Sequence, residues 1–553
     1  MAGFFNELKR RSVIKVAIVY GAVAWVVIQI ADSTFSSLNL PDWAETFVIV
    51  IAGIGFPIAL VLAWAFDLTP NGVIRTPAEN DSEAVVKAAP SDVDDKSIAV
   101  LPFVNMSADQ ETEYFSDGVS EEILNVLVAI PELRVAARTS SFSFKGQNVD
   151  IRKIAGALNV ANVLEGSVRK AGDQLRITAQ LIEAESGYHL WSGTFDRKME
   201  NIFEVQDNIA QAISSALRLQ LTGAADETPM IEARTSDLKA YDLYLRGRFE
   251  HEKRTPEGLK AAEKALEEAV ALDPNFASAW GSLSWAYTEG ALGWDASQPP
   301  RQRIDKAEKA IDRALAIDPD QYSALMSQAI IDGEFNHNWR KADEGFKISI
   351  ALQPDDARAR QFYAVQLGRQ GRGDEAMEQA RLAADSDPLS PVVGFTPLAT
   401  LRVTRQLEKG YKEGRHVIAR WPEFPLGLVL AGLTAIDVGK LDEAEGLLKQ
   451  AEKYLSPGLP LMGMAKAQML ILKGDREAAK AIVDGFLEPN CKFFTPPALI
   501  ASFFATLGDE SAAAEWLDKA CEEGDPHLLL PHLTEPLQES ESFKAIYKRM
   551  GLA

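Results

Sequence analysis

The chain has 553 residues, 47% of them hydrophobic and 25% charged, which is the composition of folded protein and excludes a wholly disordered chain. Its formal net charge of −22, from 57 basic and 79 acidic residues, argues against a general nucleic-acid surface, because phosphate binding needs a clustered basic footprint. Its two cysteines, Cys491 and Cys521, have neither CxxC spacing nor neighbouring histidines, so the sequence indicates neither a disulfide framework nor a zinc site.

The N-terminal part of the chain, residues 1–66, contains two long apolar runs. The runs cover about residues 13–31 and 46–66, and as helices they are about long enough to cross a bilayer core of about 30 Å. Basic residues precede the first run, whereas residues 32–45 contain no Lys or Arg, and excess basic residues mark cytoplasmic segments. The sequence therefore predicts a membrane hairpin over residues 1–66, with both chain termini in the cytoplasm. A cleaved secretory signal over residues 16–28, followed by a single anchor, is the alternative.

Two segments of the chain have the composition of linkers. Residues 67–96 are rich in Pro, Asp, Ser and Asn and have almost no bulky apolar residues, which predicts a flexible linker. Residues 222–237 form a second, shorter one. Between and after them the apolar pattern returns, so each linker separates predicted domains.

Residues 97–222 have the pattern of a small α/β domain. The apolar run at residues 97–103 predicts a buried strand, and Ser120 is placed to cap a helix over residues 121–130. A second strand at residues 133–138 and a helix at residues 151–158 follow. Alternating apolar and polar residues then predict three antiparallel strands over 162–184 and 187–197, and an amphipathic helix over 201–221 closes the domain.

The order of motifs in this domain resembles the TolB amino-terminal-like domain. The motifs are SIAVLPF, EYFSDGVSEEI, RTSSFSFKG, VLEGSVRKAGDQLRITAQL and HLWSGTFDR, within residues 97–221. With the predicted hairpin and the repeats described next, the chain is similar to bacterial inner-membrane proteins of TolB-like and repeat architecture, which implies a multi-pass inner-membrane location. TolB itself works in the periplasm, whereas the charge balance here predicts a cytoplasmic domain. The resemblance therefore implies a mixed α/β fold and no inherited partner.

Residues 237–553 repeat with a period of about 34 residues. A compact residue marks one helix in each of about eight units, and another compact residue usually follows seven positions later. The marks are Ala262, Ala307, Ala342, Ala376, Gly410, Ala444, Ala478 and Ala513. A proline stands twelve positions after each of the first five marks, at Pro274, Pro319, Pro354, Pro388 and Pro422.

This spacing predicts stacked helical hairpins. Positions i, i+4 and i+7 share one helical face, so compact residues there let a neighbouring helix approach closely, and the proline ends the helix. The pattern resembles the tetratricopeptide (TPR) repeat family, which implies an all-α superhelix with a capping helix near residues 541–550. An insertion at residues 290–301 is expected to loop out, and Gly410 and Gly414 weaken the fifth unit by about 1 kcal/mol each. An unrelated helical domain whose alanines fall in register is the alternative.

No sequence motif predicts catalysis, a metal site or a cofactor. The phosphate-binding loop, the dinucleotide fingerprint, the nucleophile elbow and the kinase signatures are all absent from the sequence. The best candidate for anion binding is RTSSFSFKG, where a predicted helix start would present free amide groups. Its polar candidates are Arg138, Ser140, Ser141 and Lys145. A solvated turn that packs Phe142 and Phe144 inward is the alternative.

The TPR resemblance implies partner binding along the concave face formed by the first helix of each unit. The candidate partner-binding residues are Trp285, Met326, Ile330, Arg358 and Gln361. Ser278, Gly281 and Val365 are expected on the same face. Their residue types include frequent interface anchors, although each is also compatible with simple packing.

The predicted fold class is therefore multidomain, with a two-helix transmembrane hairpin, a small α/β domain and an all-α TPR superhelix. The predicted function is that of a membrane-anchored, noncatalytic scaffold or adaptor that recruits protein or peptide partners, in bacterial signalling or envelope-related assembly. The alternative is a nucleotide-binding sensor or enzyme centred on residues 97–222, with the repeats as its regulator.

Overall fold

The computed structural model divides the chain into two compact units, Met1–Asp92 and Val93–Ala553. In the second unit it describes residues 94–107, 112–128, 130, 133–172, 174–198, 235–294, 299–455, 460–488, 491, 494–523, 525 and 541–549. In the first unit it describes residues 24, 25, 29, 50, 56, 66–69 and 72–75. Strands β1 (Phe66–Thr69) and β2 (Gly72–Arg75) of the first unit pair in an antiparallel hairpin.

The structure contradicts the predicted transmembrane hairpin, and the fold class is corrected accordingly. A membrane-spanning helix needs about 20 predominantly apolar residues, and in the described part of the chain no helix combines that length with enough apolar character. Most of residues 13–31 and 46–66 lie outside the described residues, and Phe66 at the end of the second run lies in strand β1. The same finding contradicts the predicted multi-pass inner-membrane location.

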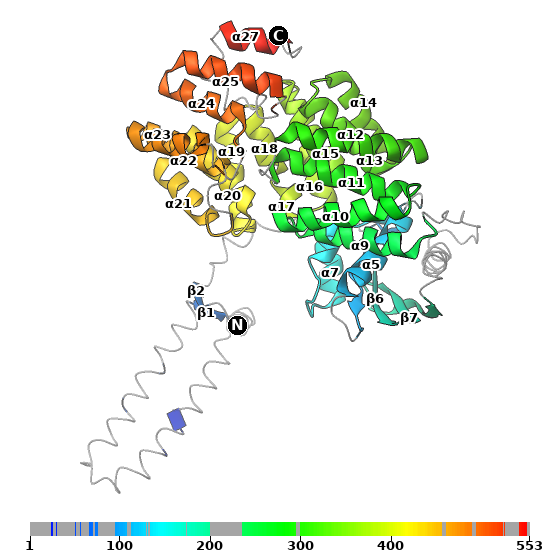
Figure 1. Ribbon diagram of the computed structural model, residues 1–553. Helices are drawn as coiled ribbons and strands as arrows, with labels where there is room; N and C mark the ends of the chain where they lie inside the picture. Colours follow the sequence, from blue (N-terminus) through cyan, green and yellow to red (C-terminus); the bar gives the residue numbers. More distant parts are fainter. Residues whose placement is uncertain are drawn as a thin grey trace, which may run out of the picture. The chain divides into compact units, whose positions relative to one another are not determined.

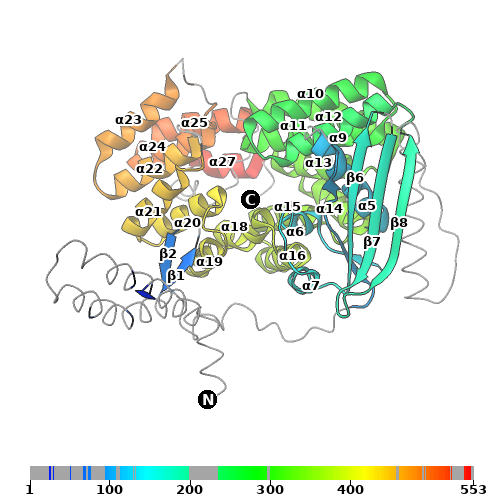
Figure 2. The same cartoon turned by 90° about the horizontal axis from the view of Figure 1, so that it is seen from below.

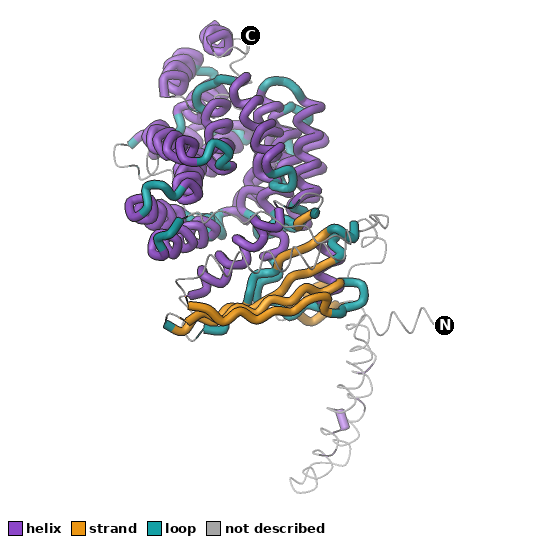
Figure 3. The backbone as a smooth tube through the Cα atoms, turned by 90° about the vertical axis from the view of Figure 1, so that its right-hand side faces the viewer, coloured by secondary structure: helices purple, strands orange, loops and turns teal. Residues whose placement is uncertain are grey.

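A mixed sheet forms the first part of the second unit. Its strands are β3 (Ser97–Val100), β4 (Val104–Asn105), β5 (Arg134–Val135), β6 (Asn162–Ala171), β7 (Gln174–Glu183) and β8 (His189–Lys198). The order is β5-β3-β6-β7-β8, and β4 also pairs with β6. Strand β3 pairs in parallel with β5 and with β6, and β4 pairs in parallel with β6. Strands β6, β7 and β8 form the antiparallel ladder predicted from their alternating residues. Figure 3 shows this sheet beside the helices of the repeats.

Three helices accompany the sheet: α5 (Glu113–Val128), α6 (Arg138–Phe142) and α7 (Ile151–Leu158). The predicted cap at Ser120 is wrong, because α5 begins at Glu113 and Ser120 lies inside it. The Ser120 hydroxyl donates to the Ser116 carbonyl oxygen at 2.9 Å and accepts from the Phe103 amide at 2.8 Å. The helix starts early because its apolar i, i+4 spacing begins at Phe115. The helix predicted over 201–221 lies outside the described residues.

Eight helix pairs and a final helix follow in the described residues, and they form a TPR-like superhelix (Figure 1). The first four pairs are α9 (Leu238–Glu252) with α10 (Pro256–Leu272), α11 (Ala277–Glu289) with α12 (Pro300–Ile317), α13 (Tyr322–Glu334) with α14 (Trp339–Leu352), and α15 (Ala357–Arg369) with α16 (Gly373–Ser386). The fifth joins α17 (Pro391–Gly394) and α18 (Thr396–Val403) with α19 (Leu407–Arg420). The remaining elements are α20 (Pro425–Asp437) with α21 (Leu441–Ala451), α22 (Pro460–Leu472) with α23 (Arg476–Leu487), α24 (Pro497–Leu507) with α25 (Glu510–Glu523), and α27 (Glu541–Arg549).

The compact residues that revealed the repeat lie where helices meet. Six of the eight marks are alanines with 0% exposure, whereas in the seventh unit Ala479, rather than the predicted Ala478, is the buried residue. Each of the five predicted prolines follows the end of a second helix by two residues. A proline disfavours helical backbone in the residue before it, so each of these helices stops at the same point of its repeat.

The insertion and the fifth unit depart from the regular pattern. The segment predicted to loop out begins as a π-helical turn, Gly290–Trp294, and α12 begins at Pro300. In the fifth unit the first helix is broken between Gly394 and Thr396. A β-carbon at Gly394 would collide with the Trp421 ring, so the glycine permits a close approach between the broken helix and the end of α19.

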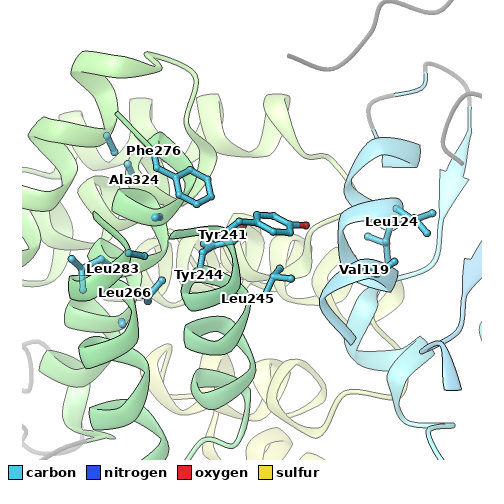
Figure 4. Packing of buried hydrophobic residues seen from close by; sticks show 14 of the residues in the cluster. Val119, Leu124, Tyr241, Tyr244, Leu245, Leu266, Phe276, Leu283 and Ala324 are labelled. Atoms are coloured by element: carbon cyan, nitrogen blue, oxygen red, sulfur yellow. The ribbon is translucent and has the colours of Figure 1, made fainter. Parts of the chain in front are cut away.

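A single hydrophobic cluster joins the sheet domain to the first repeats. Residues of α5 and residues of α9 and α11 belong to this cluster, and Gly118 of α5 brings the Leu245 side chain against the helix backbone. Figure 4 shows Leu245 and Tyr241 of α9 pointing toward α5, which carries Val119 and Leu124. The α/β domain is therefore packed against the superhelix through apolar contacts as well as polar ones.

Candidate functional site

The first helices of the repeats face the α/β domain, and buried charges connect the two. Arg248 of α9 makes ion pairs with Glu121 and with Glu122 of α5, the latter at 3.2 Å, and donates to the Tyr244 hydroxyl at 2.7 Å. The side chains of Glu121 and Glu122 are 9% and 7% exposed. Because a buried carboxylate needs a counter-charge, Arg248 couples the position of α5 to the first repeat.

Helix α6 carries three of the four predicted anion-binding residues, Arg138, Ser140 and Ser141, into the same interface (Figure 2). The Arg138 guanidinium lies 3.0 Å from Glu121 and 3.0 Å from Glu252 at the end of α9. The Thr139 and Ser140 hydroxyls donate to the Asp387 carboxylate at 2.6 and 2.5 Å, just after α16. These hydrogen bonds join residues that lie far apart in the sequence, so α6 fixes the α/β domain against the fourth repeat.

The other two predicted anion-binding residues also have protein surroundings. The Lys145 ammonium donates to both oxygens of Asp117 at 2.6 and 2.7 Å and lies 2.8 Å from Glu113. Burial raises the pKa of Asp117 despite this ion pair. Ser141 is fully buried, and its hydroxyl makes no hydrogen bond within the described residues. Lys145 therefore faces carboxylates, which repel an incoming anion.

Burial and pairing act in opposite directions on the carboxyl groups of this interface. Burial raises the pKa of Asp387, and the hydrogen bonds that it accepts from two hydroxyl groups offset this only in part. Burial would also raise the pKa of Glu252, but attraction to Arg138 and neighbouring cations outweighs it and lowers this pKa to about 2. Glu252 thus remains ionised as a counter-ion, whereas Asp387 makes no salt bridge within the described residues.

A cavity of about 310 Å³ lies between α5, α6 and the first helices of the repeats. Three of the five predicted partner-binding residues line it, namely Trp285, Arg358 and Gln361. Arg358 is paired with Asp356 at 2.5 Å, and Gln361 donates to the Val392 carbonyl oxygen at 2.8 Å. The cavity therefore combines residues of the predicted concave face with Arg138, which was predicted for a separate site.

The remaining two partner-binding candidates lie in the core. Met326 and Ile330 are both 0% exposed and share a hydrophobic cluster with Trp285 and Phe346. In this arrangement they shape the repeat from within and present no surface to another molecule. The repeat period predicts which residues lie on the first helices. The burial of each side chain also depends on the tilt between neighbouring helices, which the repeat period does not determine.

Sequence reasoning missed a row of buried polar pairs between successive first helices. The pairs are His251 with Glu289, Glu334 with Arg369, and Arg402 with Asp437. Their positions recur about one repeat apart near the ends of otherwise apolar helices. The signal in the sequence is a charged residue that recurs near the C-terminal end of each otherwise apolar first helix, and it could have revealed these pairs.

The sheet domain and a larger part of the chain each resemble known proteins. Residues 94–212 match the family described as "HilA/YgeH-like transcriptional regulator, second domain". A curated relative named "Putative adenylate cyclase 3", from Rhizobium meliloti (strain 1021), is 42% identical over 204 residues, which are 37% of this chain and 35% of the relative. The chain thus spans about a third of the length of that relative. The matched family carries a different description from TolB, so the TolB resemblance stays a prediction.

Solved structures with helical repeats are similar to this chain only at low TM-scores. The PilF protein of Pseudomonas aeruginosa has a TM-score of 0.28 and 17% identity, and the match covers 39% of this chain and 96% of that one. A tetratricopeptide repeat protein of Parabacteroides merdae has a TM-score of 0.33 and 11% identity, with coverage of 57% and 100%. The TPR-like superhelix of this chain is evident instead from its own stacked helix pairs.

Proposed function

We propose that this chain is a noncatalytic protein-interaction scaffold in which the superhelix holds the α/β domain and recruits a further protein. The observation that supports this most directly is the interface at α6. There the first-helix side of the repeats binds a folded domain through Arg138, Thr139 and Ser140. A surface that binds one protein domain by ion pairs, hydroxyl hydrogen bonds and apolar packing is suited to protein recognition.

We further propose a role in signal transduction. The α/β segment matches a family described as part of transcriptional regulators, and the curated relative is named a putative adenylate cyclase. Because both names denote signalling proteins, a module of this kind fits a regulatory chain. The domain limits predicted from the sequence, 97–222 and 237–553, are retained as part of this proposal.

The later repeats offer a surface for an external partner. The first helices α20, α22 and α24 together line a small, mostly apolar hollow of about 20 Å³, which we call the groove. Gln468 and Ser502 are half-buried residues of this groove, and Leu461 and Thr506 are exposed to a similar degree. This volume admits about one water-sized group, so a peptide or helix lying on this face would insert one small apolar group there and otherwise contact the half-buried residues around it.

The nucleotide-sensor alternative has less support from the geometry. A phosphate needs cations that are free to approach it, but Arg138 and Lys145 are already paired with carboxylates. The curated relative's name alone does not favour cyclase chemistry here, because only about a third of that protein is matched.

Affinity capture with the whole chain tests the proposed groove. Ser502→Arg places a charge in the groove, and Ser511→Arg places the same charge on exposed α25 as a matched control. We expect a partner that the wild-type chain and the Ser511→Arg variant retain and the Ser502→Arg variant loses. Equal retention by both variants would contradict the groove, and binding of AMP by the α/β domain with no protein partner would favour the sensor alternative.

A further inference from the structure

The cavity between the α/β domain and the repeats has the size of a small-ligand site. Its volume of about 310 Å³ is at the lower end of the range of roughly 300–1,000 Å³ that ligand pockets occupy. It is lined from both sides, by the ends of α5 and α9, by α6, and by α11, α15 and α18. A ligand in it would touch both folded parts of the second unit.

The charges around the cavity favour a cation. Seven carboxyl groups and five guanidinium groups line it, an excess of two carboxyls. Every one of those guanidinium groups has a carboxylate within salt-bridge distance: Arg138, Arg248, Arg254, Arg358 and Arg369. By contrast, Asp355 and Asp387 make no salt bridge within the described residues. A phosphate or carboxylate would meet no unpaired guanidinium group in this lining. An ammonium group would meet two carboxyls without a salt bridge, of which Asp355 is attracted to the more distant Arg134 and Arg360 and Asp387 accepts hydrogen bonds from the Thr139 and Ser140 hydroxyls.

Aromatic rings supply the apolar part of the lining. Trp285 and Phe362 lie edge to face with their ring centroids 5.7 Å apart, and Phe395 lines the cavity as well. Ring faces attract ammonium groups and also pack against hydrocarbon. Aromatic rings beside carboxyls that make no salt bridge therefore favour an organic amine over a metal ion.

An unpartnered hydroxyl gives an independent indication of a ligand. Thr396 lines the cavity, is only 1% exposed, and its Oγ1 makes no hydrogen bond within the described residues. Buried polar groups nearly always have a partner, and leaving one without is costly. An N–H group of a bound amine would supply the missing donor.

We propose that this cavity binds a small organic cation, an amine with an apolar body, between Asp355, Asp387, Thr396 and the rings of Trp285 and Phe362. This goes beyond the scaffold function, because it assigns a small-molecule site to the interface. The named contacts belong to the repeats, and α5 and α6 of the α/β domain form the opposite wall of the cavity, so a bound amine favours the arrangement in which that wall is in place. The site thereby couples the concentration of a metabolite-sized amine to the arrangement of the two parts.

Calorimetric titration of the whole chain tests the ligand class. The amine probes are phenethylamine, agmatine and spermidine, and the comparison probes are phenylacetate, 2-phenylethanol and AMP. Phenylacetate and 2-phenylethanol keep the phenyl body of phenethylamine and replace its ammonium group by a carboxylate and by a neutral hydroxyl group. We expect at least one amine to bind, and to bind roughly tenfold or more tightly than each comparison probe, as expected for a charge-assisted contact. Tighter binding of phenylacetate or AMP, or no binding of any amine at about 10 mM, would overturn the proposal.

Variants locate the binding site and separate binding from folding. One proposed contact is removed in each of three variants, Asp355→Asn, Asp387→Asn and Thr396→Val. The matched control is Asp385→Asn, because Asp385 is an exposed carboxyl in the last turn of α16, just before Asp387. We expect the carboxyl variants to weaken amine binding about tenfold, Thr396→Val to weaken it several-fold, and Asp385→Asn to leave it unchanged. Asp355 accepts no hydrogen bond within the described residues, so its variant remains informative even if Asp387→Asn unfolds the chain. Unchanged binding in Asp355→Asn and Thr396→Val would place the amine elsewhere and contradict the site.

Discussion

At the scale of single residues, the fold depends on a few positions where no side chain fits. Gly166 of β6 is one of them, because a β-carbon there would meet the Thr178 carbonyl oxygen of β7 and the Phe103 ring. Neither neighbour is the end of a flexible chain, so the strand ladder or the ring has to move. The sequence marks Gly166 only as a glycine within an alternating strand, and the reason for it lies in residues far along the chain.

Gly166→Ala should lower the free energy of unfolding by roughly 1–3 kcal/mol, the usual cost of overpacking a close contact. Urea unfolding followed by circular dichroism measures it. Gly156→Ala is the control in the same domain, since the added methyl group meets nothing within 4 Å in helix α7. That change should be neutral or stabilising by up to about 1 kcal/mol. A Gly166→Ala protein as stable as wild type would show that β6 and β7 are less closely packed than described.

Glu252 makes the association of the α/β domain with the repeats sensitive to acid. Attraction to Arg138 lowers its pKa from the ordinary 4.5 to about 2, against the effect of burial. A carboxyl with a lowered pKa in the folded state stabilises that state fully above about pH 5 and progressively less as the pH falls toward 2. Burial raises the pKa of Asp387, so that group acts in the opposite direction.

A comparison with Glu252→Gln isolates this effect, because the other carboxyls are shared by both proteins. The side chain of Glu252 is 30% exposed, so we expect the variant to be less stable at pH 7 by only roughly 1–2 kcal/mol. The difference should fall to about half or less by pH 3. Chemical unfolding at several pH values measures it, and a difference that stays constant over this range would contradict the ion pair with Arg138.

At the scale of elements, successive repeats are joined by buried ion pairs in addition to their apolar contacts. Arg402 of α18 lies 2.9 Å from Asp437 of α20 and donates to the Thr434 hydroxyl at 2.9 Å. The side chains of Arg402 and Asp437 are 3% and 9% exposed. Removing one member of such a pair leaves a buried charge without its counter-ion, which costs more than the pair itself contributes.

Arg402→Met should therefore destabilise the chain by roughly 3 kcal/mol or more, and the double variant Arg402→Met with Asp437→Leu should recover most of that loss. Thermal unfolding of the single and double variants measures both effects. Equal destabilisation by the single and double variants would show that the cost comes from lost packing at α18 and not from the charge on Asp437.

The sequence predicted the repeat elements well because their spacing is local. Compact residues at one phase and a proline at another determine where each hairpin closes, and both signals lie within one repeat. Burial of the partner candidate Met326 was not predictable in the same way, because it depends on the angle between helices of adjacent units. The start of α5 at Glu113 was missed because Ser120 has the residue type of a helix cap, whereas its hydroxyl accepts from the Phe103 amide in the segment between β3 and β4.

At the scale of the whole molecule, the α/β domain and the repeats form one compact unit. No local pattern predicts this, because the contacts join Ser140 to Asp387 and Glu122 to Arg248 across long stretches of sequence. The two candidate sites that the sequence presented separately, the RTSSFSFKG segment and the first-helix face, meet at this interface. Their meeting changes the interpretation of both, since Arg138 of the first site lines the same cavity as Trp285, Arg358 and Gln361 of the second.

Arg248→Glu should weaken this association, because it places a third carboxylate against Glu121 and Glu122. The shared hydrophobic cluster predicts that the wild-type α/β domain and the first repeats unfold in one calorimetric transition. We expect the variant to show two transitions, and the added change Glu122→Lys to restore one. A single unaltered transition in Arg248→Glu would mean that the apolar contacts alone determine the association.

The central claim is that the α/β domain is held against the superhelix in one arrangement, and an electron-spin distance measurement on the whole chain tests it most directly. Spin labels at exposed Lys153 and Arg381, with Cys491 and Cys521 changed to serine, report on α7 and α16, and labels at Lys309 and Arg381 provide the control within the repeats. We predict a single narrow distance distribution for both label pairs, and a broader one for the first pair in the Arg248→Glu variant. A broad or two-peaked distribution between positions 153 and 381 in the wild-type chain, beside a narrow control, would contradict the account.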